Sequence, residues 1–350
     1  MVVQMKDVAE RAGVSLSTVS FVLNKKRGQS ISPETSKRVW AVAQELNYHV
    51  NVHARRLARG KSNFVGLIIS EIANPFFPDV IRGFETAATN RGLELLLCNT
   101  EYQAERMEAA VNKMLGEGVR GVAIMTSTFS KEQLKALANN RVPVVLLSVG
   151  PNPPRARKIE IDFSKGMLQA IDHLVALGHK RFGVISGPAN IGSAATTRDA
   201  FLHSLASRGL RAECVVESNY RVDGGISAVR SLLNQGAMPS ALLCGNDIIA
   251  IGIISALQEA NIRVPDDVSV VGVDDILFAR LACPPLTTIH VPREELGKLG
   301  FEILDKMRRS SKNAVTRQVE THLVIRKSTA APKAQSPQRL GSGSSTRSVL

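Results

Sequence analysis

A chain of 350 residues is longer than one ordinary domain, so its length predicts two or three domains. Hydrophobic residues make up 44% of the chain and charged residues 21%, a balance typical of globular proteins with real cores. The apolar runs are far shorter than a bilayer-spanning helix, and the first ten residues contain acids but no apolar segment of a secretory signal. Four scattered cysteines without CxxC spacing favour reduced thiols. These features exclude the membrane, secreted and disulfide-framework classes and predict a cytoplasmic protein.

The net charge of +13 is concentrated at the two ends of the chain. Residues 1–62 carry +7, residues 327–350 carry +4, and the long middle carries only +2. A basic end on a near-neutral body is typical of a protein that binds a polyanion such as DNA. On charge alone, a solvated basic surface without a ligand is the alternative.

The first fifty residues show the spacing of three short amphipathic helices. Gly13 ends the first helix, Ser15 can cap the second, and Ser32 can cap the third. In the second helix, a rotation of 100° per residue places Ser17 and Phe21 opposite the apolar face. Two helices around a glycine turn, braced by a third, predict a helix-turn-helix, although such three-helix units also serve as protein-binding modules.

The rest of the chain alternates apolar runs with helical patterns, which predicts an α/β body of buried parallel sheets. Length and the number of strands suggest two such sheets, hence two lobes. The predicted strands are 64–69, 93–98, 121–125, 142–149, 182–186, 241–244 and 268–273. The predicted helices are 79–91, 103–116, 164–177, 223–235 and 248–260.

Residues 6–24 (KDVAERAGVSLSTVSFVLN) and 45–48 (ELNY) resemble the head of the LacI/GalR (lactose/galactose repressor) family of transcriptional regulators. The resemblance implies that the second helix lies in the major groove of double-stranded DNA. The residues implied to bind DNA in this head are Leu16, Ser17, Thr18, Ser20, Phe21 and Asn24. Leu16, Ser17 and Phe21 are expected at base edges, whereas Thr18 and Ser20 are expected at phosphates, which position the protein without reading the sequence.

Phe21 departs from the family pattern, because many similar proteins have arginine there. Arginine can bind guanine through two hydrogen bonds, whereas phenylalanine offers only apolar contact, for example to a thymine methyl group. Packing of Phe21 back onto Lys25 or the third helix is the alternative.

Residues 51–62 resemble the hinge helix of the same family, which orders in the DNA minor groove at the centre of the operator. The resemblance implies that Leu57 is wedged between base pairs and that Ala54 lines the groove, with Ala58 on the same helical stripe. Arg55, Arg56 and Arg59 are expected to neutralise phosphates. Without the resemblance, this stretch is better interpreted as a solvated basic linker. Val50 stands where the family usually has proline.

Family landmarks continue to about residue 327, at residues 74–77, 177–179, 244–247, 264–275 and 284–288. The implied fold resembles the periplasmic sugar-binding proteins, with two doubly wound parallel-sheet lobes and a ligand in the cleft. We therefore expect a helix-turn-helix head (1–50), a hinge (51–62) and a two-lobed body for effector binding and dimerisation (63–327).

The effector is expected where parallel strands end, since open α/β sheets bind ligands there. Asn246 and Asp274 each follow a predicted strand and suit paired hydrogen bonds to hydroxyls or ring nitrogens. Capping of a helix is the alternative for Asn246 or its neighbour Asp247. Phe76 or Phe77 could stack on a sugar or a base. Two further candidates occupy positions where the chain departs from the family: Ser148, where many members have aspartate, and Arg198, one step from the usual arginine position.

Residues 328–350 are rich in serine and contain no acid, so we expect a disordered tail. A leucine heptad for tetramerisation is missing, which favours a dimer. No phosphate-binding loop, dinucleotide fingerprint or HExxH motif indicates an enzyme, and His173 and His179 are poorly spaced for a metal.

These observations predict a transcriptional regulator of the repressor type that binds a palindromic operator as a homodimer. A small-molecule effector is expected, a sugar or sugar derivative, with no cofactor and no metal. The alternatives are a sugar-binding protein with a vestigial DNA head and an enzyme built on the cleft.

Overall fold

The computed structural model describes residues 3–23, 31–48, 62–148, 157–236, 238–309 and 316–333. The chain divides into two compact units between Ser62 and Asn63, and each unit has its own hydrophobic core. Among the described residues, no helix combines the length and the apolar character needed to span a membrane.

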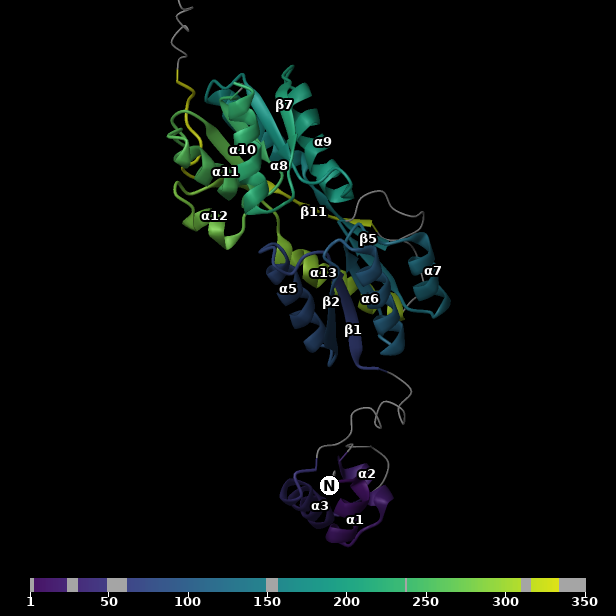
Figure 1. Cartoon of the computed structure of the whole chain (residues 1–350). Coiled ribbons are helices and arrows are strands. Elements are labelled where there is room, and N and C mark those ends of the chain that lie inside the picture. The colour runs from purple at the N-terminus through teal and green to yellow at the C-terminus, as the bar shows by residue number, and fades with distance from the viewer. Residues whose placement is uncertain are drawn as a thin grey trace, which may run out of the picture. The chain divides into compact units, whose positions relative to one another are not determined.

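The first unit is a cluster of three helices, α1 (Met5–Ala12), α2 (Leu16–Leu23) and α3 (Pro33–Glu45) (Figure 1). Gly13 ends α1 with a φ of 62°, a left-handed conformation that glycine adopts without steric cost. The backbone N–H of Thr18 donates to Ser15 Oγ at 3.1 Å, and that of Thr35 donates to Ser32 Oγ at 3.1 Å. These contacts confirm the three predicted helix ends. The shared core consists of Val8, Ala9, Ala12, Val19, Val22, Leu23, Val39, Val42 and Ala43.

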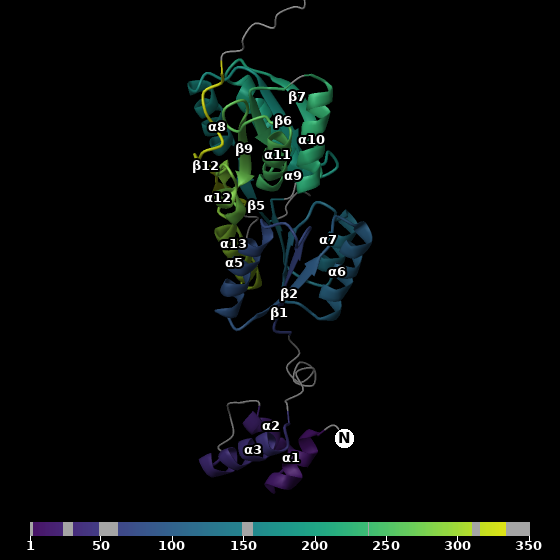
Figure 2. The same cartoon turned by 60° about the vertical axis from the view of Figure 1, so that its left-hand side comes forward.

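The first lobe of the second unit is a six-stranded parallel sheet in the order β11-β5-β4-β3-β1-β2. Its strands are β1 (Phe64–Ile69), β2 (Glu94–Asn99), β3 (Val122–Met125), β4 (Val144–Leu147), β5 (Arg157–Asp162) and β11 (Thr316–Glu320). Its helices are α5 (Phe77–Thr89), α6 (Ala104–Gly116), α7 (Lys131–Asn139) and α13 (Arg293–Arg309). Helices α5 and α13 lie side by side (Figures 1 and 2), so close that a Cβ atom on Gly83 would lie 2.0 Å from the Glu294 carbonyl oxygen.

The second lobe has the strand order β12-β10-β9-β8-β6-β7, in which only the edge strand β12 is antiparallel among the described strands. Its strands are β6 (Phe182–Ser186), β7 (Ala212–Glu217), β8 (Ala241–Cys244), β9 (Ser269–Asp274), β10 (Thr287–His290) and β12 (His322–Val324). Its helices are α8 (Ser164–Ala176), α9 (Gly192–Ala206), α10 (Val222–Asn234), α11 (Asp247–Glu259) and α12 (Leu277–Leu281). The chain crosses between the lobes from β5 to α8, from β10 to α13 and from β11 to β12 (Figure 2).

The predicted fold class, a helical head followed by two doubly wound α/β lobes, is confirmed. The seven predicted strands are present, and the described part of the chain contains five further strands that were not predicted. Strand β7 alternates half-buried and exposed residues, β5 is mostly polar, and β10 buries Thr287 and Thr288 completely. A search for continuous apolar runs misses such strands because their polar residues are satisfied by neighbours that are distant in the chain.

The prediction of a disordered tail from residue 328 is wrong for its first residues. Ser328 is completely buried, where its hydroxyl donates to the Val270 carbonyl at 2.6 Å and accepts from the Thr287 N–H at 2.8 Å. The Ala330 carbonyl accepts a hydrogen bond from His179 at 2.8 Å. The segment 328–333 therefore belongs to the second lobe, and the remainder of the predicted tail lies outside the described residues.

Candidate functional site

Helix α2 presents a mixed polar and apolar face away from the core of the first unit. Leu16 is 52% exposed, Ser17 is exposed, and Thr18, Ser20 and Phe21 are half-buried. The hydroxyl oxygens of Ser17 and Thr18 each lie 2.8 Å from Ser15 Oγ, so the cap also orders the start of this face. All five candidates therefore lie on α2, outside its buried face, and their contacts to DNA stay predictions.

The remaining DNA-binding candidates lie outside the described residues. These are Asn24, which follows α2, and the hinge residues Ala54, Arg55, Leu57 and Ala58.

A cavity of about 670 Å³, its open mouth included, lies between the two lobes of the second unit. Several of its lining residues follow the carboxyl ends of strands, among them Ser70 after β1, Ser148 after β4 and Asn246 after β8. This is the edge at which open α/β sheets bind ligands.

Aromatic side chains line a large part of this cavity. Phe76 and Phe77 are both buried, and their rings meet edge to face with centroids 5.4 Å apart. Tyr102, Phe163 and Tyr220 complete the aromatic lining. Burial raises the pKa of the Tyr220 hydroxyl, which therefore stays protonated and able to donate a hydrogen bond. Such an arrangement offers flat apolar surfaces with polar tips to a ligand.

Asn246 both caps a helix and lines the cavity. Its Oδ1 accepts a hydrogen bond from the Ile249 N–H at 2.8 Å at the start of α11, and its Nδ2 donates to the Tyr220 carbonyl at 3.4 Å. The capping interpretation and the ligand-site interpretation are thus compatible, since the amide is held in place by the helix that follows it.

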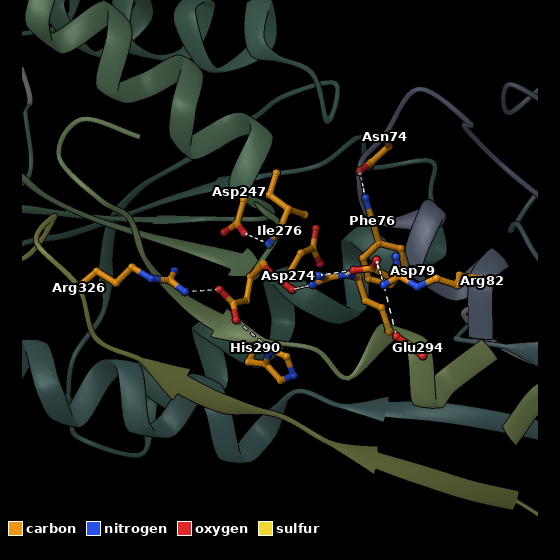
Figure 3. A network of polar contacts seen from close by, with 12 residues as sticks. Asn74, Phe76, Asp79, Arg82, Asp247, Asp274, Ile276, His290, Glu294 and Arg326 are labelled. Carbon is orange, nitrogen blue, oxygen red and sulfur yellow. Dashed lines mark hydrogen bonds and ion pairs between the residues drawn. The ribbon is translucent and has the colours of Figure 1, made fainter. Parts of the chain in front are cut away.

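Asp274 lies at the end of β9 and lines the cavity, as its place after a strand predicted (Figure 3). Its φ of 113° lies in a region that side-chain-bearing residues rarely adopt. Burial raises the pKa of its carboxyl group well above the usual value, and the neighbouring Asp247 raises this pKa further, while Arg293 opposes the shift. Its carboxyl oxygens are available for hydrogen bonds with a ligand in the cavity.

Asp247 is completely buried behind Asp274 and belongs to the framework of the site. Its Oδ2 accepts from the Ile276 N–H at 2.9 Å (Figure 3). Its Oδ1 accepts from the Thr288 hydroxyl. Burial raises the pKa of Asp247 to about 7, although these two hydrogen bonds oppose the shift.

Two serines add hydroxyl groups to the cavity. Ser148 has a φ of 46° and lines the wall after β4, as predicted. Ser127, which the sequence analysis missed, also lines the cavity, and its buried Oγ has no hydrogen-bond partner within the described part of the chain. Buried hydroxyls are rarely unpaired, so a ligand group is a natural partner for it.

Arg198 is not among the described residues that line the cavity, so its role in effector binding stays a prediction. Its guanidinium group pairs with Asp199, and the neighbouring Thr197 faces the cavity instead. The reason is helical rotation, since adjacent residues of α9 point about 100° apart. No lysine or arginine is found among the described residues that line the cavity.

Tyr102 and Tyr220 are site residues that sequence reasoning missed. Tyr220 follows β7, a strand that the sequence analysis did not predict, and Tyr102 and Tyr220 adopt positive φ values of 58° and 61°. The signal that could have found them is a tyrosine three residues after a strand end, on the edge where the other candidates lie. Within the described ranges, no three histidine, cysteine or acidic side chains gather as a metal site requires.

Residues 4–51 match the family described as "Bacterial regulatory proteins, lacI family", and residues 171–329 match the "Periplasmic binding protein-like domain". The chain is 34% identical over 302 residues to the HTH-type transcriptional repressor PurR of Glaesserella parasuis, covering 86% of this chain and 88% of that protein. It is 35% identical over 329 residues to PurR of Photobacterium profundum, and the match covers 93% of this chain and 98% of that protein.

Solved structures of regulators share the fold over most of the chain. A Lac repressor dimer bound to operator and the anti-inducer ONPF superposes with a TM-score of 0.84 at 29% identity, covering 95% of this chain and 100% of that one. A complex of the transcriptional regulator CelR with cellobiose gives a TM-score of 0.69 at 27% identity, covering 93% and 99%. A LacI family regulator from Enterococcus faecium with bound ribose gives a TM-score of 0.70 at 25% identity, and the match covers 77% of this chain and 100% of that one.

Proposed function

Because the chain belongs to the lacI family of bacterial regulatory proteins and is therefore a DNA-binding transcriptional repressor, we propose that it binds a palindromic operator as a homodimer under the control of a small molecule. The observation that carries the proposal is the presence, in one chain, of an exposed helix-turn-helix face and a buried ligand cavity. We place this activity in the cytoplasm, where the DNA of a bacterium lies.

The proposed DNA contacts divide into base readout and phosphate positioning. Leu16, Ser17 and Phe21 would meet base edges in the major groove, since α2 presents them away from the core. Thr18 and Ser20 would contact phosphates, as would Arg55 of the hinge. In the same proposal, Asn24 completes the head contacts and Ala54, Leu57 and Ala58 enter the minor groove, where Leu57 bends the DNA.

The proposed effector is an uncharged sugar or sugar derivative. Phe76 and Phe77 offer faces for a sugar ring, while Asn246, Asp274 and Ser148 offer hydrogen bonds to hydroxyl groups. A phosphate or carboxylate group would be buried without a cationic partner among the described lining residues, which is costly. The cellobiose and ribose complexes of the similar regulators agree with this ligand class.

The proposed dimer uses helix α12 of the second lobe. Leu277, Phe278 and Leu281 are 65%, 50% and 70% exposed within one helix of five residues. An exposed apolar cluster of this kind is typical of an association surface. In a two-fold dimer the same cluster on each subunit can pack against its copy, which removes both from solvent. The similar Lac repressor is a dimer on its operator.

Selection of bound fragments from random DNA, with the full chain at two salt concentrations, tests the DNA-binding part. We expect a palindromic sequence to be enriched at both concentrations, since base readout survives when phosphate attraction is screened. Enrichment of no sequence would contradict the proposal.

Thermal unfolding with matched ligands tests the effector class. We expect ribose or cellobiose to raise the melting temperature and ribose 5-phosphate to leave it unchanged, because ligand binding stabilises the folded state. Stabilisation by the phosphorylated sugar alone would overturn the uncharged class.

A further inference from the structure

Arg293 occupies the point where the chain crosses from the second lobe to the first. It begins α13, directly after the segment that leaves β10, and is only 8% exposed. Its Nε and Nη2 donate to Asp79 Oδ2 at 3.1 and 2.8 Å. Its Nη1 donates to the Asp274 carbonyl, and its Nη2 donates to the Asp275 carbonyl at 3.1 Å. One guanidinium group thus binds both lobes.

The two carbonyls that Arg293 binds belong to an unusual stretch of backbone. Asp274 and Asp275 have φ values of 113° and 55°, which side-chain-bearing residues adopt only when the surroundings hold them. On its other side, the Asp275 carboxylate accepts hydrogen bonds from His290 at 2.9 Å and from Arg326 (Figure 3). The direction in which the Asp274 side chain enters the cavity therefore depends on contacts to its main chain.

The other partner of Arg293 belongs to the opposite wall of the cavity. Asp79 lies in the first turn of α5, the helix that begins with the cavity residue Phe77 (Figure 3). Arg293 consequently connects the wall that carries Asp274 with the wall that carries Phe77. These bonds use all three guanidinium nitrogens, whereas the three donors of a lysine share one nitrogen and do not reproduce this geometry.

We infer that Arg293 is a positioning residue of the ligand site, which holds the Asp274 main chain against α5 and thereby sets where the Asp274 carboxyl group meets a ligand. This inference rests on the proposed use of the cavity by an effector. It assigns a role to a residue that does not line the cavity itself.

Arg82 is a matched control within the same network. Its Nη2 donates to the same carboxylate, at Asp79 Oδ1 and 2.7 Å, and pairs with Glu294 at 3.3 Å. It is 61% exposed, and both of these partners belong to the first lobe. A change at Arg82 therefore removes one ion pair of Asp79 and leaves the Arg293 contacts between the lobes in place.

Hydrogen exchange of the full chain without ligand tests the inference. In R293K and R293Q we expect amides at 70–79 and at 274–280 to exchange about tenfold faster than in the wild type, because both walls lose their common partner. R82K and R82Q should exchange as the wild type does. Equal acceleration in β6 and β8 would show a general loss of structure and would overturn the positioning role, and so would wild-type exchange in R293K. R293K keeps the positive charge, so its exchange rates test the positioning role even if R293Q fails to fold.

The pKa of the Asp274 carboxyl group, followed by carbon-13 NMR, separates charge from position. We expect this pKa to rise in R293Q, which loses a nearby cation, and to stay closer to the wild-type value in R293K. R293K should thus keep the Asp274 pKa close to the wild-type value while its amides at 70–79 and 274–280 still exchange faster. If R293K matched the wild type in both measurements, only the positive charge of Arg293 would matter.

Ribose and cellobiose serve as probes of binding. If one of them binds the wild type, its dissociation constant should rise about tenfold in R293K and remain unchanged in R82K. If neither binds, the proposed effector class fails, while the exchange experiment still decides the role of Arg293.

Discussion

Leu16 is an apolar side chain that leaves half of its surface in solvent at the first residue of a helix. Nothing in the core of the head requires leucine there, because the buried face of α2 consists of Val19, Val22 and Leu23. An exposed leucine beside Ser17 suits apolar contact with the floor of a DNA groove.

Replacement of Leu16 by alanine should weaken binding to the selected operator by about tenfold, the cost of one lost apolar base contact of ~1–3 kcal/mol. Binding to random DNA and its salt dependence should not change, since no phosphate contact is lost. Fluorescence anisotropy with both DNAs measures this. Trp40→Ala, which removes an exposed side chain from α3, is the control. Equal loss on both DNAs would contradict the base-reading role.

Asp247 makes the stability of the second lobe depend on pH. Its pKa is about 7 in the folded protein against an ordinary value of 3.8. Between these two values the folded chain keeps a proton that the unfolded chain has released, so the free energy of unfolding falls as pH rises. The slope approaches ~1.4 kcal/mol per pH unit for one such group. Asp274, whose pKa is also raised, adds to the same trend.

In Asp247→Asn, the decrease of the unfolding free energy from pH 4 to pH 7 should therefore be shallower than in the wild type. Urea unfolding at a series of pH values measures the two slopes. Asp267→Asn is a control of opposite sign, because hydrogen bonds from Arg263 lower the pKa of Asp267, and its contribution is lost below pH 4. If the unfolding free energies of Asp247→Asn and the wild type changed with pH in parallel, the raised pKa of Asp247 would be disproved.

At the scale of elements, α12 carries exposed apolar side chains that the proposed dimer would cover. Only Ala279 of its five residues is buried. A solitary helix of this length has little intrinsic stability, so its exposed leucines and phenylalanine are best explained by a second copy of the chain.

Leu281→Lys should convert the dimer to monomers at micromolar concentration, because two lysines would face each other across the two-fold axis. Sedimentation velocity measures the assembly, and operator affinity should fall with it. Val215→Lys, an exposed position on β7, should remain dimeric. A Leu281→Lys chain that sediments as the wild type would place the interface elsewhere.

The segment 328–333 is a second element whose role shows only in its partners. Val270 donates its N–H to the Ser328 carbonyl at 2.8 Å, and Thr287 donates to the Ser328 hydroxyl. Val270 and Thr287 are completely buried in the full chain, so both hydrogen bonds form where water does not compete for the donors.

A chain that ends at residue 327 should consequently lose at least ~3 kcal/mol of unfolding free energy, since each buried group left unpaired costs ~1–3 kcal/mol. A chain that ends at residue 333 keeps all of these contacts and should match the full chain within ~0.5 kcal/mol. Chemical denaturation compares the three chains. Equal stability of both truncated chains would contradict the structural role of Ser328.

For the whole molecule, the two proposed binding events must be coupled in both directions. If an effector changes operator affinity by some factor, the operator must change effector affinity by the same factor, typically ~5–150-fold. Titration of operator with and without effector, and of effector with and without operator, measures the two factors. Unequal factors would show that the effector acts through something other than a shared equilibrium.

Some features followed from local sequence alone. Gly13, Ser15 and Ser32 determine the helix ends of the head because a cap depends on only a few neighbouring residues. The continuous apolar strands and the polar residues that follow them, Asn246 and Asp274, were predictable because strand ends of parallel sheets share one edge.

Other features were decided only by the tertiary structure. Whether Thr197 or Arg198 faces the cavity depends on the packing of α9, and the burial of Ser328 depends on strands far from it in the chain. The contact between Arg293 and Asp79 joins residues 214 positions apart. Helix caps and hydrophobic periodicity depend on a few neighbouring residues. Contacts such as these exist only once the chain has folded, so no local spacing in the sequence predicts them.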